Sequence, residues 1–399
     1  MTINRLIPKR TTAKGSRGYP ATFWIITVGL VLYNGLGFHR LLQQAHGIRP
    51  LVEDDTTTEK KMCVLFVGPH KTGSTTLENF LEEGRPALKQ DHYANYGIGI
   101  AHVVVPCLGK NRDKEKDDLC NEKLNELKSF ISENAGRSNI ILAHEWLDFS
   151  NLNLNKLTSY LIPNYNIHVV VNYRRFYDWI YSYYNQIHKN PTHQHNKKIP
   201  TFQKWLTAHM EKEFRDKYSL SVYKRYSSLP EIYNVSVVNM HHDADNFDTV
   251  EAFACDQLDD APHTCEAAKS RPKAIHKNPS KPLDWKIFRQ RLKNYHSIGH
   301  VPDDDERWQD IEQKFDSMTD VPKACLSDDL KNKLLQISIQ SETFMTPEWF
   351  HNSEEGLAFL KSDFEKKIKT TLCDIDVQAI VMSNEWQGFL GGLETLSRK

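Results

Sequence analysis

A glycine-containing turn with a lysine and several hydroxyl side chains follows the apolar run 62–67 (MCVLFV) and reads GPHKTGSTTLENFL over residues 68–81. Backbone N–H groups at the start of a helix have no partner within it and carry partial positive charge, so they bind phosphate. Gly73 lets the backbone approach an anion closely, and Lys71 supplies a full positive charge. We expect phosphate to be held by His70, Lys71, Thr72, Gly73, Ser74, Thr75 and Thr76. A turn that only caps a helix is the alternative interpretation.

The position of the lysine separates this turn from the P-loop of ATPases and GTPases. That loop has the pattern G-x-x-x-x-G-K-[ST], in which lysine follows the second glycine directly. Here Gly68 and Gly73 have the expected separation, but Ser74 follows Gly73 and the lysine lies two residues before it. The sequence therefore predicts a phosphate compound other than a nucleoside triphosphate.

A second candidate phosphate contact lies in the segment 169–186, VVVNYRRFYDWIYSYYNQ. Arg174 follows the apolar run directly, and Ser182 comes eight residues later, about two turns along the expected helix. Both side chains can therefore reach one phosphate, and the planar fork of arginine suits bidentate binding of that group. A salt-bridged helix start at Arg174 and Arg175 is the alternative.

Candidates for a general base occur after another apolar run, in IILAHEWLDF (residues 140–149). Histidine and carboxylate side chains are the usual groups that remove a proton from a hydroxyl. His144 and Glu145 are the preferred pair in this sequence. The alternatives are His70, Asp91 with His92, and His241.

The elements that must position these residues are four short apolar runs, at 62–67, 140–143, 167–171 and 235–238. Runs of this length that alternate with helical patterns are typical of buried parallel strands, as in α/β domains. Leu77, Phe80 and Leu81 predict a helix that begins near Ser74 or Thr75, and an apolar stripe predicts another from Phe176. Open α/β sheets bind ligands at the carboxyl ends of their strands. We therefore expect His70–Lys71, His144–Glu145, 172–175 and 239–242 to meet at one edge of a mostly parallel sheet flanked by helices.

The two phosphate segments together resemble a known family. HKTGSTTL (residues 70–77) is similar to the 5′-phosphosulfate loop of Golgi membrane sulfotransferases. Arg174, Ser182 and the pair Tyr183–Tyr184 match the family's 3′-phosphate motif. The order of elements is similar over about residues 60–260. The R-K-G segment of the cytosolic branch has no equivalent here, although the basic stretch 269–293 is a candidate substitute.

This resemblance implies that 3′-phosphoadenosine 5′-phosphosulfate (PAPS) is the co-substrate and that no metal is needed. Lys71 would neutralise charge on the bridging oxygen while the adenosine bisphosphate leaves, and His144 or Glu145 would take the proton of the acceptor hydroxyl. The resemblance and the aromatic content favour a carbohydrate acceptor over tyrosine or lipid. Two alternatives to a sulfotransferase remain. One is a luminal kinase or other nucleotide-dependent transferase that uses the same loop, and the other is a non-catalytic protein with the same fold.

Composition limits the other partners. The 399 residues carry no net charge, with 51 basic and 51 acidic side chains, so no overall field favours nucleic acid. Sequence does not assign an oligomeric state, nor decide whether the chain from about residue 300 forms the acceptor site or an added helical layer.

The N-terminus predicts a membrane anchor. Residues 21–38 are uncharged and have about the length that crosses a bilayer, and the basic residues before them place the N-terminus in the cytosol. A cleaved signal peptide is the alternative. We expect a cytoplasmic tail (1–20), an anchor (21–38), a stem (39–60) and a luminal domain (61–399), arranged as a single-pass type II protein of the Golgi membrane.

An oxidising compartment would allow the seven cysteines to form disulfides. Cys255 and Cys265 are the strongest predicted pair, while Cys107–Cys120 and Cys325–Cys373 are plausible pairs. Cys63 lies in an apolar run and is expected to be a buried free thiol. Asn234-Val235-Ser236 is the single predicted glycosylation sequon.

Overall fold

The computed structural model describes residues 60–97, 99–100, 103, 107–109, 117–188, 199–210, 218–241, 247–272, 284–293, 305–347 and 354–396. The expected tail and anchor and nearly all of the stem, residues 1–59, lie outside them. None of the helices described in these ranges is both long and apolar enough to cross a membrane.

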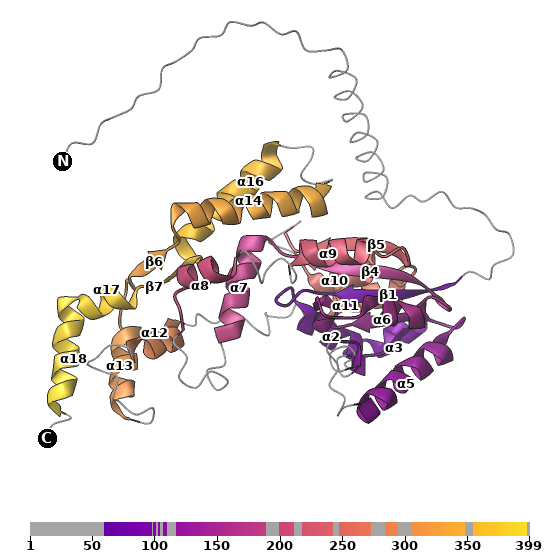
Figure 1. Cartoon of the computed structure of the whole chain (residues 1–399), viewed down its shortest axis with the longest axis horizontal. Helices are drawn as coiled ribbons and strands as arrows, with labels where there is room; N and C mark the ends of the chain where they lie inside the picture. The colour runs from indigo at the N-terminus through magenta and orange to yellow at the C-terminus, as the bar shows by residue number, and fades with distance from the viewer. Residues whose placement is uncertain are drawn as a thin grey trace, which may run out of the picture. The chain divides into compact units, whose positions relative to one another are not determined.

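The fold contains a parallel five-stranded sheet in the order β2-β3-β1-β4-β5. Figure 1 labels three of its strands, β1, β4 and β5. Each neighbouring pair of these strands is parallel. The strands are β1 (Lys61–Val67), β2 (Tyr93–Asn95), β3 (Asn139–Ala143), β4 (Tyr165–Tyr173) and β5 (Ile232–Asn239). Four of them contain the apolar runs from which strands were predicted. The short β2 was not predicted, since YAN has no apolar run.

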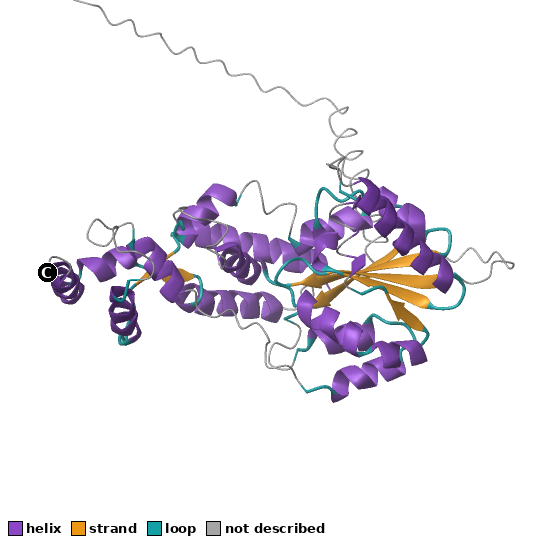
Figure 2. Ribbon diagram, turned by 90° about the horizontal axis from the view of Figure 1, so that it is seen from below, coloured by secondary structure: helices purple, strands orange, loops and turns teal. Residues whose placement is uncertain are grey.

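Helices cover both faces of this sheet (Figure 2). Along β1, Cys63, Leu65 and Val67 belong to one apolar cluster, whereas Val64 and Phe66 belong to another on the opposite face. Successive side chains of a strand point to opposite faces, so a strand that is apolar throughout must be covered on both sides. The prediction of a mostly parallel α/β sheet flanked by helices is confirmed.

The helices that pack on the two faces come from different parts of the chain. One face contacts α2 (Ser74–Glu83), α3 (Arg85–Gln90), α10 (Thr249–Asp256) and α11 (Pro262–Ser270). The other contacts α5 (Asp117–Asn134), α6 (Leu154–Leu161), α7 (Phe176–His188), α8 (Phe202–His209) and α9 (Ser219–Ser227). The predicted helices after β1 and β4 are α2 and α7.

The C-terminal third is mostly helical. It contains α12 (Asp284–Leu292), α13 (Arg307–Asp316), α14 (Asp328–Met345), α16 (Glu354–Thr370), α17 (Val377–Met382) and α18 (Asn384–Leu396), with β6 (Lys323–Cys325) antiparallel to β7 (Cys373–Ile375). Phe288, Trp308 and Trp386 belong to a separate apolar cluster here. However, α14 packs against α7 and α9, so this region also contacts the sheet domain.

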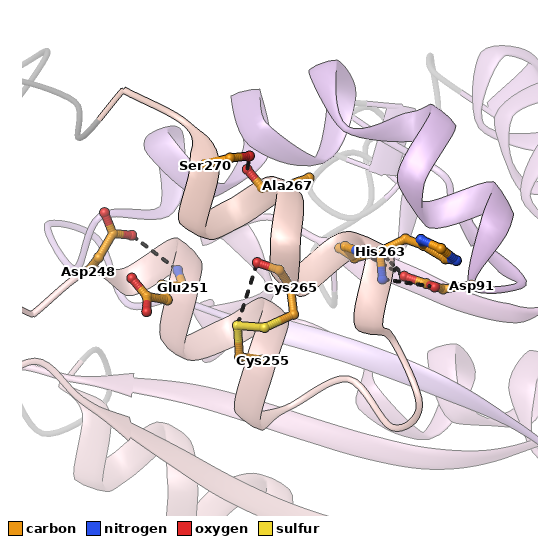
Figure 3. The surroundings of a disulfide bond; sticks show 9 residues. Asp91, Asp248, Glu251, Cys255, His263, Cys265, Ala267 and Ser270 are labelled. Atoms are coloured by element: carbon orange, nitrogen blue, oxygen red, sulfur yellow. Dashed lines mark hydrogen bonds between the residues drawn. A yellow bond between two sulfur atoms is a disulfide. The ribbon is translucent and has the colours of Figure 1, made fainter.

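Three disulfides join Cys107 to Cys120, Cys255 to Cys265 and Cys325 to Cys373. Figure 3 shows the second of them, which joins α10 to α11. Cys63 is a buried free thiol, and burial raises its pKa far above the ordinary value. All four predictions for the cysteines are confirmed.

Candidate functional site

The turn between β1 and α2 has an alternating backbone conformation. Lys71 has φ 74° and Gly73 has φ 85°, whereas φ is negative at Thr72 between them. Turns with residues in the left-handed region can point N–H groups toward an anion. Here the N–H groups of His70 and Thr72 already donate to Asp148 Oδ2 and to the carbonyl of Pro69, so an anion would be held by N–H groups at the start of α2 and by Lys71. No side chain caps α2, so the first N–H groups of this helix are not satisfied by a cap. Of the two interpretations of the turn, this geometry favours phosphate binding.

Three consecutive carbonyl groups of the turn accept hydrogen bonds from the end of β4 and from α7. Trp179 Nε1 donates to the carbonyl of His70 at 2.8 Å. Arg174 Nη1 donates to that of Lys71 at 3.1 Å, and Asn172 Nδ2 to that of Thr72 at 2.8 Å. The conformation of the phosphate segment is therefore fixed by the second predicted segment.

The hydroxyl groups of the turn have different environments. Thr72 is buried, and its hydroxyl donates to the carbonyl of Pro69 at 2.6 Å, so it stabilises the turn itself. Ser74 is also buried, while Thr75 is exposed and Thr76 is half-buried. A Cβ added to Gly68 would lie 2.9 Å from Oγ of Ser74, which explains the glycine there.

Arg174 lies at the end of β4, beside the turn. Burial lowers the pKa of its guanidinium and the Asp178 carboxylate opposes this shift, but an arginine remains charged in either case. Ser182 is buried on α7, two turns further along. The structure therefore brings Arg174 to the loop and places Ser182 on the helix that follows it, as predicted.

His70 lies between two carboxylates. Its Nδ1 is 3.3 Å from Oδ2 of the buried Asp148, which also accepts from the His70 backbone N–H at 3.2 Å. Its Nε2 is 3.7 Å from Oε1 of Glu145. A carboxylate at Nδ1 assigns the ring proton of neutral His70 to that nitrogen, so Nε2 is the basic atom.

His144 has a different role in this arrangement. Its Nδ1 accepts a hydrogen bond from the backbone N–H of Trp146 at 3.0 Å and so caps the short 3₁₀ helix η2 (Glu145–Asp148). The neutral ring must then carry its proton on Nε2, where it is a donor. Glu145 is the member of the predicted pair that reaches toward the turn, since it approaches His70.

Two of the other candidate bases, His241 and Asp91, accept hydrogen bonds from backbone N–H groups, whereas His92 is exposed. His241 accepts from the backbone N–H of Arg175 at 2.9 Å, and burial lowers its pKa well below the ordinary value, as do the nearby cations Arg175, Lys367 and Arg174. Asp91 caps α11, since it accepts from the backbone N–H groups of His263 and Thr264 near the disulfide of Figure 3.

A carboxyl that was not predicted, Glu78, lies on α2 next to this group. Its pKa is raised to about 7, chiefly by burial and also by the nearby Glu145 carboxylate, against a hydrogen bond from the Glu145 backbone that lowers it. The spacing of Glu78 in the helix gave no signal, because the group that acts on it, Glu145, lies in η2 and comes near it only in the folded chain.

Arg175 is ion-paired, as the alternative interpretation of 174–175 stated. Its Nε lies 2.9 Å from Oε1 of Glu342 on α14, and its Nη1 lies 3.1 Å from Oδ2 of Asp363 on α16. Arg175 and Glu342 are both fully buried. These partners follow it by more than 160 residues and could not be predicted from spacing.

Comparisons with known proteins do not assign this chain to a family. No protein-family model matches the chain, and no curated protein matches it in sequence. Among solved structures, a chain from the PezAT chromosomal toxin–antitoxin system of Streptococcus pneumoniae aligns with 11% identity over 51% of this chain and 77% of that chain. The TM-score of 0.26 is too low to support an argument about fold or function.

Proposed function

We propose that this chain is a sulfotransferase that uses PAPS to sulfate a hydroxyl group of a carbohydrate acceptor. The observation that carries the proposal is the hydrogen bond from Arg174 to the carbonyl of Lys71, because it joins the two phosphate segments at one edge of the sheet. Two phosphate-binding elements side by side suit a donor with phosphate groups at both the 5′ and the 3′ position.

The residues at this edge fit such a donor. The N–H groups at the start of α2 and Lys71 would hold the phosphosulfate end, and Arg174 with Ser182 would hold the 3′-phosphate. Sulfuryl transfer depends mainly on positioning and on stabilising charge, much as phosphoryl transfer does. In this reaction the acceptor oxygen forms a bond to sulfur, the bond from sulfur to the bridging oxygen breaks, and adenosine 3′,5′-bisphosphate leaves.

Among the candidate bases, the geometry favours His70. Asp148 fixes its ring and leaves Nε2 as the proton acceptor, whereas Nδ1 of His144 is already occupied. Glu145 lies close enough to His70 to stabilise the imidazolium that results. Lys71, the next residue, would stabilise the charge of the leaving group.

The proposal includes the location inferred from the sequence: a type II anchor at 21–38 and a catalytic domain in the Golgi lumen. The three disulfides are consistent with an oxidising compartment.

Calorimetry with the purified full-length chain tests this function. Adenosine 3′,5′-bisphosphate should bind equally well with EDTA and with Mg²⁺, and more tightly than ATP with Mg²⁺. Lys71→Ala and Arg174→Ala should each weaken binding roughly 10- to 100-fold, the value of a charge-assisted hydrogen bond. Lys89→Ala, an exposed lysine at the end of α3, is the matched control. Preference for ATP with Mg²⁺, or no binding of the bisphosphate by the folded chain, would refute the proposal.

A further inference from the structure

Lys367 lies on α16, in the C-terminal third of the chain, and contacts α7, the helix that carries Ser182 of the candidate 3′-phosphate site. Its Nζ pairs with Oδ2 of Asp178, a buried residue in the first turn of α7. Asp178 lies four residues after Arg174 and four before Ser182, and its carboxylate acts electrostatically on Arg174. The Lys367–Asp178 pair therefore lies beside the two residues proposed to hold the phosphate.

The charges around this pair are balanced. The cations are Arg174, Arg175 and Lys367, and the carboxylates are Asp178, Glu342 and Asp363. His241 lies among these cations and is held neutral, since its Nε2 accepts from a backbone N–H. Three positive and three negative charges balance within this group, so the attraction of a phosphate dianion depends on how close each charge lies to it.

Asp178 is the carboxylate of this group that follows Arg174 by about one helical turn, in the first turn of α7, so it is the one expected to oppose a phosphate at Arg174. Lys367 offsets that charge from the other side, and it is held in place by the ring of Tyr177 at 5.6 Å and by Asp363 at 3.6 Å. Without Lys367, a phosphate at Arg174 would lie near the buried Asp178 carboxylate with no lysine from α16 to offset its charge. In low dielectric such a charge repels a second anion strongly.

We infer that Lys367 is a positioning residue of the nucleotide site: by neutralising Asp178 it permits a 3′-phosphate to bind at Arg174. This inference rests on the proposed function and deepens it, since it assigns the C-terminal helices a part in nucleotide binding. Asp178 is then the group that limits affinity, and its neutralisation should have the opposite effect to loss of Lys367.

The experiment compares two ligands that differ only in the 3′-phosphate, adenosine 3′,5′-bisphosphate and adenosine 5′-phosphate, by displacement titration on the full-length chain. Lys367→Met should weaken the binding of adenosine 3′,5′-bisphosphate about tenfold and leave the binding of adenosine 5′-phosphate unchanged. Lys367→Arg keeps the positive charge and should keep the wild-type ratio of the two affinities. Asp178→Asn should increase the affinity for the bisphosphate severalfold. Lys366→Met, an exposed neighbour on α16, is the matched control.

The two failures are distinguishable. If the wild type binds the bisphosphate and Lys367→Met binds it equally well, or loses both ligands equally, the role of Lys367 is refuted while the proposed function stands. If the wild type does not bind the bisphosphate at all, both are refuted. Near-ultraviolet circular dichroism of each variant shows whether its tertiary packing is intact.

Discussion

The guanidinium of Arg174 donates to the backbone carbonyl of Lys71, across 103 positions of sequence. This bond joins the end of β4 to the turn after β1, which are neighbouring strands of the sheet. Residues 68–77 and 172–184 are therefore in contact, and a change in either is expected to affect the other.

Replacement of His70 and of His144 should give different results. His70→Ala should lower the rate of sulfuryl transfer at least about 100-fold, the usual contribution of a general base, with little change in bisphosphate affinity. His144→Ala should retain the base but lose the cap of η2, at a cost of about 1 kcal/mol in stability. The measurements are transfer of labelled sulfate from PAPS to a panel of glycans and urea unfolding. A larger rate loss in His144→Ala than in His70→Ala would contradict this assignment.

Glu78 should make stability depend on pH. Its pKa is raised from 4.5 to about 7 in the folded protein, so the folded state binds the proton more tightly than the unfolded state. The resulting stabilisation is complete below pH 4.5 and is lost as pH rises to 7. Urea unfolding at pH 5 and pH 8 measures the free energy of unfolding of Glu78→Gln and of the wild type. The value of the variant relative to the wild type should be higher at pH 8 than at pH 5. Glu83→Gln, exposed on the same helix, should show no such trend; equal behaviour of the two variants would contradict the prediction.

Removal of the Cys325–Cys373 disulfide should destabilise the C-terminal region. Its cysteines lie 48 positions apart, and a loop of that length corresponds to about 4 kcal/mol in the chain-entropy model. The double change Cys325→Ser and Cys373→Ser should accordingly lower the free energy of unfolding. Thiol titration gives an independent check: the unreduced, denatured wild type should expose one thiol, Cys63, and the variant the same number. Unchanged stability of the variant would show that the disulfide does not restrict the unfolded chain.

The ion pair between Arg175 and Glu342 should be costly to break from one side. Both side chains are buried, so Arg175→Met leaves the Glu342 carboxylate without its partner and should cost about 3–5 kcal/mol. Adding Glu342→Met should restore much of the loss, because a buried pair can be exchanged for apolar groups at little cost. Chemical denaturation of the single and double variants measures the coupling. If the double variant loses as much free energy of unfolding as the two single variants together, Arg175 and Glu342 do not act as a unit.

The sequence predicted the parts of the fold that depend on local pattern. The strands at 62–67 and 167–171 are continuously apolar, and Leu77, Phe80 and Leu81 have helical spacing, so β1, β4 and α2 were predicted correctly. β2 was missed because a three-residue edge strand needs no apolar run. Topology then explains why the polar strand ends meet, since neighbouring parallel strands end at one edge.

Partners from distant segments could not be predicted in the same way. Histidine spacing does not show that Nδ1 of His144 caps η2 or that Asp148 binds His70. Nor does sequence show that Arg175 pairs with residues of α14 and α16. These contacts arise only when separate elements pack together, so they depend on tertiary structure and not on local pattern.

The three side chains that hold the carbonyls of His70, Lys71 and Thr72 have a consequence for the order of folding during synthesis. All of them lie about a hundred positions after the turn that they hold. At ribosomal rates of about 5–20 residues per second, the turn leaves the ribosome roughly 5–20 s before Trp179 does. During that interval the segment cannot take its final conformation. A nascent chain that ends before β4 has none of these three side chains and should therefore lack the final conformation of the turn, even where β1 and β3 are complete.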